Sequence, residues 1–517
     1  MWNRRDTLKS LLLGTAALST GIALPWRVFA QQEERFPNTL TIPPLLEGSV
    51  VDGVRHYDLR LQEGVSQFLP GLSTPTWGIN GDYLGPTIRM RDGEKVRMTV
   101  HNALPEDTSM HWHGFLVPAV CDGGPAQVIH PGNTWSPEFT VLQGATTNWY
   151  HSHLMHATGP QVYKGLAGMI VVDDADSGRL ELPSDYGVDD IPVIVQDREF
   201  NADGSFRYVS EYAGMIQGIQ GDTILVNGTL HPHFVATTRT VRLRILNASN
   251  ARTYQFAFAD ERSFTQIASD GGLLEAPLPR TRMILAPAER AEILVDVSDG
   301  REALLVSHGL VSTYAEYPGA MSQLVRSMDT QSFEILAIRP QSALAPSPIV
   351  PAQLRQIVRL DPSQAVTTRP VRLMMGHGMR SGEDNGPHAG MRTGFGGGFG
   401  GGFGGGNYSI NGRHHTMAFV NERVPLGDIE IWELQNSSPL THPVHIHNIH
   451  FQVLDRNGVP PPPEERGLKD TVRVLSGETV RVILRFEHYR DPETPYMYHC
   501  HMLEHEDRGM MAQFVVV

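Results

Sequence analysis

Cysteine is nearly absent from this chain of 517 residues, which contains only Cys121 and Cys500. At most one disulfide can form, so the chain is not a small scaffold held together by disulfides. Basic residues are also in deficit, because 42 Lys and Arg stand against 56 Asp and Glu, a formal net charge of −14 at pH 7. An acidic chain binds nucleic acids and anionic membranes poorly, so we expect no nucleic-acid partner.

No apolar run reaches the roughly 20 residues that a membrane-spanning helix needs, and we expect no membrane span. The run at 11–24 follows a basic start with the paired arginines Arg4 and Arg5, and precedes a small residue, Ala30. This order is typical of a cleavable export signal, and the cleavage site disfavours the alternative of an N-terminal helix in the mature fold. We predict that residues 1–30 are removed, that the twin-arginine export machinery is a partner, and that the mature protein is periplasmic.

Long amphipathic helical patterns are missing as well. Instead, polar and apolar residues alternate in short segments such as 95–100, 241–246 and 479–484. This period is that of a sheet with one wet face. Turn-forming residues, among them 51 Gly and 36 Pro in the whole chain, separate such segments at short intervals. The pattern predicts an all-β protein built from sandwiches.

The chain contains an internal repeat. Residues 110–115 are echoed by 444–449, and 150–153 by 498–501, each time with a His-x-His pair. Between these two units, 241–297 has alternating strands and no paired histidines. We therefore predict three similar units, of which the middle one binds no metal.

The unit boundaries follow turn-rich and Pro-rich stretches. We predict a first domain at 31–178, a second at 186–340, an interdomain linker at 341–370 and a third domain at 371–517. The third domain contains an insertion, 374–406, that opens with Met and His residues and turns into Gly-Phe-Gly-Gly repeats. Such a segment is expected to be flexible. Its soft side chains could hold metal ions over a site, and a surface loop without a ligand is an equally good interpretation.

Histidine is concentrated in four tight clusters. Ten of the 23 histidines belong to them: His111 and His113; His151 and His153; His442, His445 and His447; His499, His501 and His505. Residues two apart in a strand point to the same face, so each His-x-His pair presents two imidazoles to one side. Four pairs offer eight imidazoles, more than one tetrahedral zinc accepts. We predict a multinuclear cluster of an imidazole-binding metal, with copper favoured.

The same alternation makes Cys500 face away from the cluster that its neighbours serve. Its partners would be the remaining histidines, His442 and His505, with Met510 as a weak axial ligand, which is the blue-copper set. A catalytic thiol needs only one base and would leave the other histidines unexplained. The matching position of the first unit is Ser152, which cannot supply a thiolate, so only the third domain can hold this centre.

These motifs resemble those of the multicopper oxidase family, in the family's order and over the whole mature chain. The motifs are His111-Trp112-His113-Gly114, His151-Ser152-His153, His442-Pro443-Val444-His445-Ile446-His447 and the run from His499 to Met511. The chain looks most like the bacterial three-domain members, the copper-efflux oxidases, laccases and bilirubin oxidases. The resemblance implies three tandem cupredoxin-like Greek-key β-sandwich domains, four copper ions, and four one-electron substrate oxidations coupled to reduction of O₂ to two waters.

The resemblance also implies a division of the ligands. Type 1 copper would be bound by His442, Cys500, His505 and Met510, and type 2 copper by His111 and His445. The binuclear type 3 pair would be bound by His113, His151, His153, His447, His499 and His501. The cluster would then lie between the first and third domains.

Two acids are candidate catalytic residues. Reducing O₂ to water consumes four protons, so acids must lie near the cluster. Asp122, just after the first copper motif, and Glu506, beside His505, match acidic residues of the bacterial family; a solvated surface carboxylate is the alternative. Cys121 has no assigned role, and we expect a buried free thiol there.

The substrate is the least determined feature. We favour a laccase-type oxidase acting on phenols or aromatic amines, with oxidation of Cu(I) for periplasmic copper tolerance as the alternative. Residues 436–441, just before His442, contain no carboxylate or methionine where the efflux oxidases have metal-binding ones, which puts a dedicated Cu(I) site in doubt. A copper-free structural envelope protein of the same fold is a third interpretation, and the complete ligand set argues against it.

Overall fold

The computed structural model describes residues 34–208, 216–310, 329–376 and 407–517. The predicted export signal and residues 377–406 of the predicted insertion lie outside these ranges. The chain divides into two compact units, Met1–Arg35 and Phe36–Val517, and every strand and helix named below belongs to the second. Within the described ranges, no helix is both long and apolar enough to cross a membrane.

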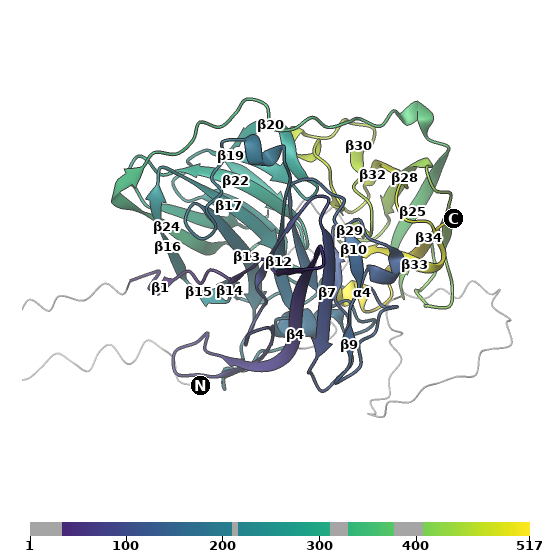
Figure 1. The fold of residues 1–517 in the computed structure, drawn as a ribbon, viewed down its shortest axis with the longest axis horizontal. Helices are drawn as coiled ribbons and strands as arrows, with labels where there is room; N and C mark the ends of the chain where they lie inside the picture. Colours follow the sequence, from purple (N-terminus) through teal and green to yellow (C-terminus); the bar gives the residue numbers. More distant parts are fainter. Residues whose placement is uncertain (1–33, 209–215, 311–328, 377–406) are drawn as a thin grey trace, which may run out of the picture. The chain divides into compact units, whose positions relative to one another are not determined.

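Strands dominate this second unit. In the described residues they form six sheets, which pack in pairs as three β-sandwiches (Figure 1). The predicted all-β sandwich fold is confirmed. The strands that the sequence placed at 95–100, 241–246 and 479–484 are β7 (Lys95–Asn102), β17 (Thr240–Asn247) and β32 (Thr479–Arg485).

The first sandwich carries the first two histidine motifs. One sheet has the order β10 (Glu138–Thr140), β7, β4 (Val54–Ser66) and β3 (Ser49–Val51), with β5 (Thr74–Ile79) beside β4 and β9 (Thr134–Trp135) beside β7. The other has the order β2 (Leu45–Leu46), β6 (Thr87–Arg91), β12 (Ala167–Asp173), β11 (Thr146–His151) and β8 (His111–His113). Both motifs therefore lie on one sheet, on the neighbouring strands β8 and β11.

The second sandwich carries none of the four predicted histidine clusters; its own His231 and His233 flank Pro232 at the start of β16 (Pro232–Thr238). Its six-stranded sheet has the order β1 (Asn38–Thr39), β16, β24 (Phe333–Ala345), β23 (Ala303–His308), β18 (Tyr254–Phe258) and β21 (Arg282–Leu285). Its seven-stranded sheet has the order β15 (Thr229–Leu230), β14 (Thr223–Val226), β13 (Asp190–Arg198), β17, β22 (Arg290–Asp296), β19 (Phe264–Ser269) and β20 (Gly272–Arg280).

The third sandwich carries the remaining motifs. One sheet has the order β26 (Asn407–Ile410), β25 (Thr367–Gly376), β28 (Ile429–Asn436), β32 and β30 (Gln452–Arg456). The other has the order β27 (Glu422–Val424), β34 (Met511–Val516), β33 (Asp491–Cys500), β29 (His442–Ile446) and β31 (Thr471–Val474). As in the first sandwich, the histidine strands, here β29 and β33, are neighbours.

Helices are short in the described part of the chain. The named α-helices are α1 (Thr158–Lys164) and α4 (Leu503–Glu506), residues 216–217 are also helical, and single 3₁₀ turns occur at Ala119–Cys121, Ser177–Arg179, Pro362–Gln364 and Pro463–Glu465. Residues of α1 contact α4, so this helix of the first sandwich lies against the helix that follows β33 of the third.

Each sandwich has its own apolar core, made by the inward-facing residues of alternating strands. In β7, for example, Val96, Met98 and Val100 are fully buried while Lys95 and Arg97 are exposed. A separate buried cluster joins residues from all three sandwiches: Leu84, Trp149, Val162, Ala167, Met169, Val171, Ile194, Leu246, Ala248, Ala288 and Leu503. Burial of this shared apolar surface holds the sandwiches against one another next to the histidine motifs.

Two features cross the predicted domain boundaries. Strand β1 lies within the range predicted for the first domain, yet it pairs in parallel with β16 of the second sandwich. The predicted linker at 341–370 begins with the last residues of β24 and ends with the first of β25, which leaves 346–366 free of strands. A two-residue strand such as β1 carries no pattern from which its partner could be deduced.

Candidate metal centres

Two pairs of neighbouring strands carry the histidine motifs. In the first sandwich β8 pairs with β11, which sets His111 opposite His151. In the third, β29 pairs with β33, which sets His445 opposite His499. Residues directly opposite in an antiparallel pair project to the same face. Each strand pair therefore gathers the imidazoles of two motifs on one face.

The residues between the paired histidines point away from the imidazoles. Trp112 lies in the core of the first sandwich, and Ile446 and Cys500 lie in that of the third. Ser152 is buried too, and its hydroxyl donates to Oε1 of Gln161 at 2.5 Å. The predicted alternation is confirmed, and it separates Cys500 from the imidazoles on either side of it.

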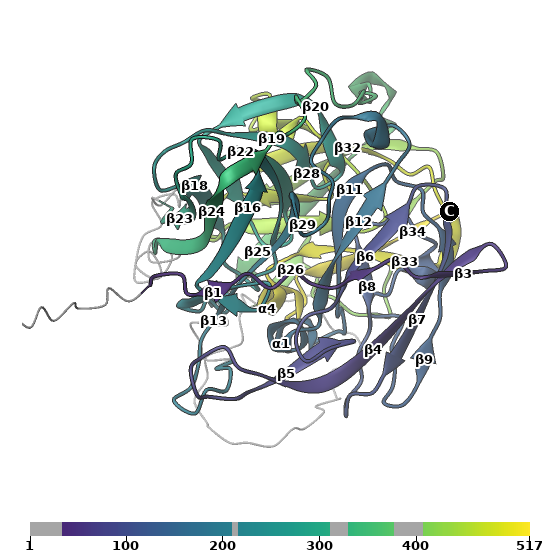
Figure 2. The same ribbon diagram turned by 60° about the vertical axis from the view of Figure 1, so that its left-hand side comes forward.

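The first and third sandwiches meet at their histidines. The ring of His111 stacks on that of His447 with centroids 4.0 Å apart, and His113 stacks on His445 at 3.7 Å. Figure 2 shows β8 and β11 of the first sandwich beside β29 and β33 of the third. Eight imidazoles, each at most 1% exposed, line this junction: His111, His113, His151, His153, His445, His447, His499 and His501.

Three of these imidazoles direct the same ring nitrogen at one point. The Nε2 atoms of His153, His447 and His499 lie 3.2 Å from one another in each pairing. Their Nδ1 atoms face outward, toward Glu506 at 3.1 Å, Asp122 at 2.7 Å and the Cys500 carbonyl at 3.1 Å respectively. Because the outward nitrogens can donate to oxygen acceptors, the inward nitrogens carry lone pairs.

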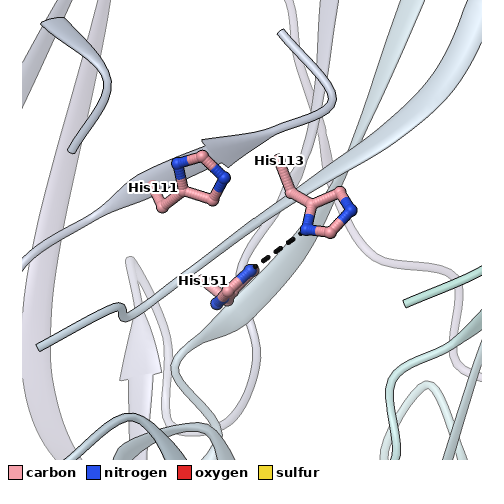
Figure 3. A group of neighbouring side chains, drawn as sticks. All are labelled: His111, His113 and His151. Carbon is pink, nitrogen blue, oxygen red and sulfur yellow. Dashed lines mark hydrogen bonds between the residues drawn. The ribbon is translucent and has the colours of Figure 1, made fainter. Parts of the chain in front are cut away.

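A second group lies on the other side of the junction. His151 donates from Nδ1 to the Ser152 carbonyl at 2.8 Å, and its Nε2 lies 3.5 Å from Nδ1 of His113. Figure 3 shows these two rings converging below His111. His501 packs against both rings, and neither of its ring nitrogens has a hydrogen-bond partner.

His111 and His445 form a matched pair. His111 donates from Nδ1 to the main-chain carbonyl of Asp122 at 2.9 Å, and His445 donates from Nδ1 to that of Asp470 at 2.8 Å. The Nε2 atoms of both rings are buried and have no hydrogen-bond partner. Buried polar atoms are almost always partnered in folded proteins, so these two nitrogens indicate a ligand.

The donor set fits copper. Burial lowers the pKa of His111, His113 and His153 well below its usual range, and that of His151 to about 4. Neutral imidazoles with convergent lone pairs are the ligands that copper prefers, and a metal ion would satisfy the unpartnered nitrogens.

A second centre lies behind Cys500. Its Sγ is 3.3 Å from Nδ1 of His442 and 3.7 Å from Nδ1 of His505, and the two nitrogens are 3.3 Å apart. The far ring nitrogens are held, His442 Nε2 by the Ser438 hydroxyl at 2.5 Å and His505 Nε2 by the Ile216 carbonyl at 2.8 Å. Two imidazoles and one sulfur in a triangle match the trigonal set of a blue-copper site.

The remaining predicted ligand, Met510, is fully buried in the same core as Cys500 and accepts the Cys500 main-chain N–H on its carbonyl at 3.0 Å. Burial lowers the pKa of His505 to about 4, which leaves this imidazole neutral. Burial raises the pKa of the Cys500 thiol. A bound cation reverses that effect, because metal ligation deprotonates a thiol.

The two predicted acids flank the cluster from opposite sides. Asp122 accepts from His447 at 2.7 Å, and burial raises the pKa of its carboxyl to about 6. Glu506 contacts His153 at 3.1 Å and His499 at 3.2 Å. Burial alone would raise the pKa of Glu506, but these imidazoles outweigh it and hold the pKa at about 2. Neither acid is a solvated surface carboxylate.

Several residues at the centres had no signal in the sequence. Trp149 stacks on His151 at 4.1 Å, the Thr158 hydroxyl donates to Glu506 at 2.7 Å, and Asp470 faces Nε2 of His113 at 3.2 Å. Arg290, from the second sandwich, pairs with Asp470. None belongs to a repeated motif, so only the packing of the sandwiches reveals them.

Cys121 is a buried residue with no ligand role. Cys121 and Cys500 are both buried and free, and the Cys121 thiol donates to the Glu138 carbonyl at 3.6 Å. This agrees with the expected free thiol. The predicted soft ligands beyond residue 376 lie outside the described residues.

The fold and the donor sets define a class: cupredoxin-like copper proteins of several domains. Models of the multicopper oxidase family match residues 60–177 and 391–517. Multicopper oxidase mco of Staphylococcus haemolyticus is 32% identical over 484 residues, covering 93% of this chain and 92% of the relative. Cell division protein FtsP of Salmonella typhimurium is 35% identical over 500 residues, covering 97% and 96%. The chain belongs to the multicopper oxidase family.

Solved structures agree. A bacterial laccase-like multicopper oxidase, CueO from Ochrobactrum sp., has a TM-score of 0.79 and 34% identity, covering 92% of this chain and all of that one. A laccase from Pediococcus acidilactici has a TM-score of 0.77 and 33% identity, covering 93% and 94%. The predicted family and its three cupredoxin-like sandwiches are thereby confirmed.

Proposed function

We propose that the protein is a copper oxidase that couples four one-electron oxidations of a laccase-type substrate, a phenol or an aromatic amine, to reduction of O₂ to water. The observation that supports this most directly is the convergence of Nε2 atoms from His153, His447 and His499, 3.2 Å apart and buried. Copper bound at these positions would supply the one-electron redox chemistry.

The geometry supports a division of the ligands among four ions. His442, Cys500 and His505, with Met510 as the axial ligand, would hold type 1 copper. His111 and His445, the matched pair with unpartnered Nε2 atoms, would hold type 2 copper. The type 3 pair would take one ion at His153, His447 and His499 and the other at His113, His151 and His501.

Strand β33 would connect the two centres. His499 and His501 project to the cluster and Cys500 to the opposite face, so a few covalent bonds separate the sulfur from each imidazole. His499 also donates from Nδ1 to the Cys500 carbonyl at 3.1 Å. Electrons from the substrate would follow this path.

The two acids would serve the proton demand of oxygen reduction. The Asp122 carboxyl, with its pKa at about 6, can exchange a proton near neutral pH. Glu506 remains a carboxylate that orients His153 and His499 and accepts a hydrogen bond from the Thr158 hydroxyl. Asp122 would hold protons for the cluster, and Glu506, unprotonated at rest, would accept them in transit.

Oxidation of Cu(I) is a second candidate, favoured by one observation. Ser437, in the segment before His442, donates its N–H to the Leu373 carbonyl of β25 at 3.1 Å. The two residues that follow in β25, Met374 and Met375, pair with Ser409 and Tyr408 of β26, and Met374 is 40% exposed. The Tyr408 ring in turn lies 4.9 Å from that of the type 1 ligand His505. Thioethers are soft ligands suited to Cu(I).

Oxygen uptake by the copper-loaded mature protein tests both candidates, with a methoxyphenol and a chelated Cu(I) donor compared under the same conditions. Faster turnover with the phenol, kept when residues 374–406 are deleted, supports the laccase. Faster turnover with Cu(I), lost on that deletion, supports the metal oxidase. A protein that stays colourless and copper-free after loading contradicts both and favours a structural role, the interpretation that the FtsP relatives, named as cell division proteins, bring forward.

Export is part of the proposal. Residues 1–30 would direct the chain to the periplasm through the twin-arginine machinery, where copper and O₂ are available. Replacing Arg4 and Arg5 by lysine is expected to leave the chain in the cytoplasm, and cell fractionation measures this. Unchanged periplasmic protein would contradict the route.

A further inference from the structure

Arg290 of the second sandwich reaches the junction between the other two. Its side chain is fully buried at the start of β22. Its Nε donates to the Thr147 carbonyl at 3.0 Å, and its Nη2 donates to Oδ1 of Asn148 at 2.9 Å, both on β11 of the first sandwich. Its two terminal nitrogens donate to the Asp470 carboxylate of the third sandwich at 2.8 and 2.6 Å. One guanidinium therefore ties all three sandwiches together.

Asp470 in turn contacts one ligand from each half of the cluster. Its Oδ1 faces Nε2 of His113 at 3.2 Å, and its main-chain carbonyl accepts from Nδ1 of His445 at 2.8 Å. The Thr471 hydroxyl donates to the same Oδ1 at 2.9 Å. Because a carboxylate paired with arginine only accepts, the proton of His113 lies on Nε2.

This contact explains an asymmetry among the cluster ligands. Most of them turn Nε2 inward, as His153, His447 and His499 do, but His113 turns Nδ1 toward Nε2 of His151. The Asp470 carboxylate and the Thr471 hydroxyl, each 3.2 Å away, lie in front of His113 Nε2. A carboxylate–histidine contact of this kind fixes both the tautomer and the ring orientation of a metal ligand.

The pair has little room to move. A Cβ atom on Gly114, which follows His113 and has a φ of +84°, would lie 2.5 Å from Oδ2 of Asp470 and 2.9 Å from Nη2 of Arg290. Lys469, the residue before Asp470, contacts Asp270 at 2.8 Å and Glu289 at 3.1 Å. Glu289 is the residue before Arg290, so a second ion pair joins the same two segments of the chain.

We propose that Arg290 is a positioning residue for the copper cluster: it holds Asp470, and through Asp470 it fixes His113 and His445 so that the two half-sites face the same ions. The inference rests on the proposed copper occupancy. It gives the second sandwich, which supplies no predicted copper ligand, a part in the metal site, since the rigid fork of this one side chain sets how the other two sandwiches meet.

The test compares Arg290→Lys with Arg244→Lys. Arg244 is an equally suitable site for the same change, because it is 4% exposed, also contacts Thr147, at 2.9 Å, and forms buried ion pairs with Asp190 and Glu292. In the described part of the chain its hydrogen-bond and ion-pair partners, Asp190, Thr147 and Glu292, include no cluster ligand. Lysine keeps the charge at either position and loses the bidentate geometry.

The readout is copper retention against a competing chelator, with the blue absorption of the type 1 centre as an internal reference. We expect Arg290→Lys to hold cluster copper about 10- to 100-fold more weakly than the unchanged protein, the usual effect of losing an outer partner of a metal ligand. The blue absorption should be unchanged. Arg244→Lys should lower the midpoint of thermal unfolding and leave cluster copper in place.

Asp470→Asn provides the second variant should Arg290→Lys fail to fold, because asparagine keeps the size of the side chain and loses its charge. Asp470→Asn should lower the affinity for cluster copper to a similar extent. The double variant Arg290→Lys/Asp470→Asn should lose less binding free energy for copper than the two single variants added together, because both changes act through one contact.

The positioning role would be overturned if Arg290→Lys and Asp470→Asn both retained all their cluster copper. It would also be overturned if Arg290→Lys and Arg244→Lys lost equal amounts of cluster copper. Either result would leave the proposed oxidase function intact. Failure of the unchanged protein to take up cluster copper would overturn both, because Arg290 would then have no metal to position.

Discussion

The first and third sandwiches present the same strand pair to the cluster, yet they differ behind it. In the third, His442, Cys500 and His505 form a triangle of metal-binding atoms. In the first, the matching face carries Thr108 and Ser152, whose hydroxyls donate to Oε1 of Gln161 at 2.8 and 2.5 Å.

Two triads of side chains can be compared: His442, Cys500 and His505 in the third sandwich, and Thr108, Ser152 and Gln161 in the first. Their difference shows which side chains a metal centre behind the cluster requires. Thr108 stands three residues before His111, as His442 stands three residues before His445, so the two occupy corresponding positions of the repeat. In the first sandwich the Thr108 and Ser152 hydroxyls both donate to Oε1 of Gln161, and these three side chains offer neither an imidazole nor a thiolate to a metal. A strand pair with alternating histidines therefore builds a cluster half-site in either sandwich, and the metal centre behind it depends on three further side chains.

Cys500→Ser makes the third triad resemble the first, and we expect the largest effect from it. Loss of the thiolate should abolish the blue absorption and reduce turnover of a phenol to background, because the path from substrate to cluster begins at this sulfur. The cluster imidazoles face the other way, so cluster copper should remain. Absorption spectra and copper analysis measure this, and a variant that still turns over would refute the assigned path.

Glu506→Gln tests the cluster from α4, where Glu506 contacts the cluster ligands His153 and His499. We expect oxygen consumption to fall by about 100-fold or more, the usual contribution of a positioned acid or base, with the blue absorption intact. The neighbouring Glu504 is the matched control, because it is buried in the same helix but is bonded to Tyr208 and Asn250 instead of imidazoles. Equal turnover in Glu506→Gln and Glu504→Gln would contradict the role of Glu506.

The blue centre should tolerate acid. Protons compete with copper for imidazole nitrogen, and this competition begins only when the pH falls toward the pKa of the free imidazole. Because burial lowers the pKa of His505 from 6.5 to about 4, copper should stay bound and blue as the pH falls to about 4. Titration of the absorption measures this, and bleaching with a midpoint near pH 6.5 would show an imidazole exposed to solvent.

Ser152→Cys tests the comparison between the two triads from the side of the first sandwich, and we expect the smallest effect from it. A thiol in the first sandwich should give no second blue band, because its neighbours there are Thr108 and Gln161. We expect unchanged turnover and a loss of about 1 kcal/mol in the free energy of unfolding, from the weakened hydrogen bond. New absorption from this variant would mean that a thiolate alone recruits copper at that position.

Strand alternation made much of this molecule predictable. It gave β7, β17 and β32 almost to the residue, and it separated Cys500 from the imidazoles beside it. Contacts between distant segments were not predictable: Arg290 and Asp470 lie 180 positions apart and meet only when the sandwiches dock. The choice of ring nitrogen in His113 depends on that same meeting, and the pairing of β1 with β16 has no local pattern either.

The placement of Cys500 on β33 has a consequence for assembly. The predicted type 1 ligands fall within positions 442–510 of one sandwich, whereas the cluster needs residues as far apart as His111 and His501. The ligand atoms of the first set thus come from one sandwich. The second set can close only after the first and third sandwiches dock, so the proposed oxygen reduction would require the correctly assembled chain.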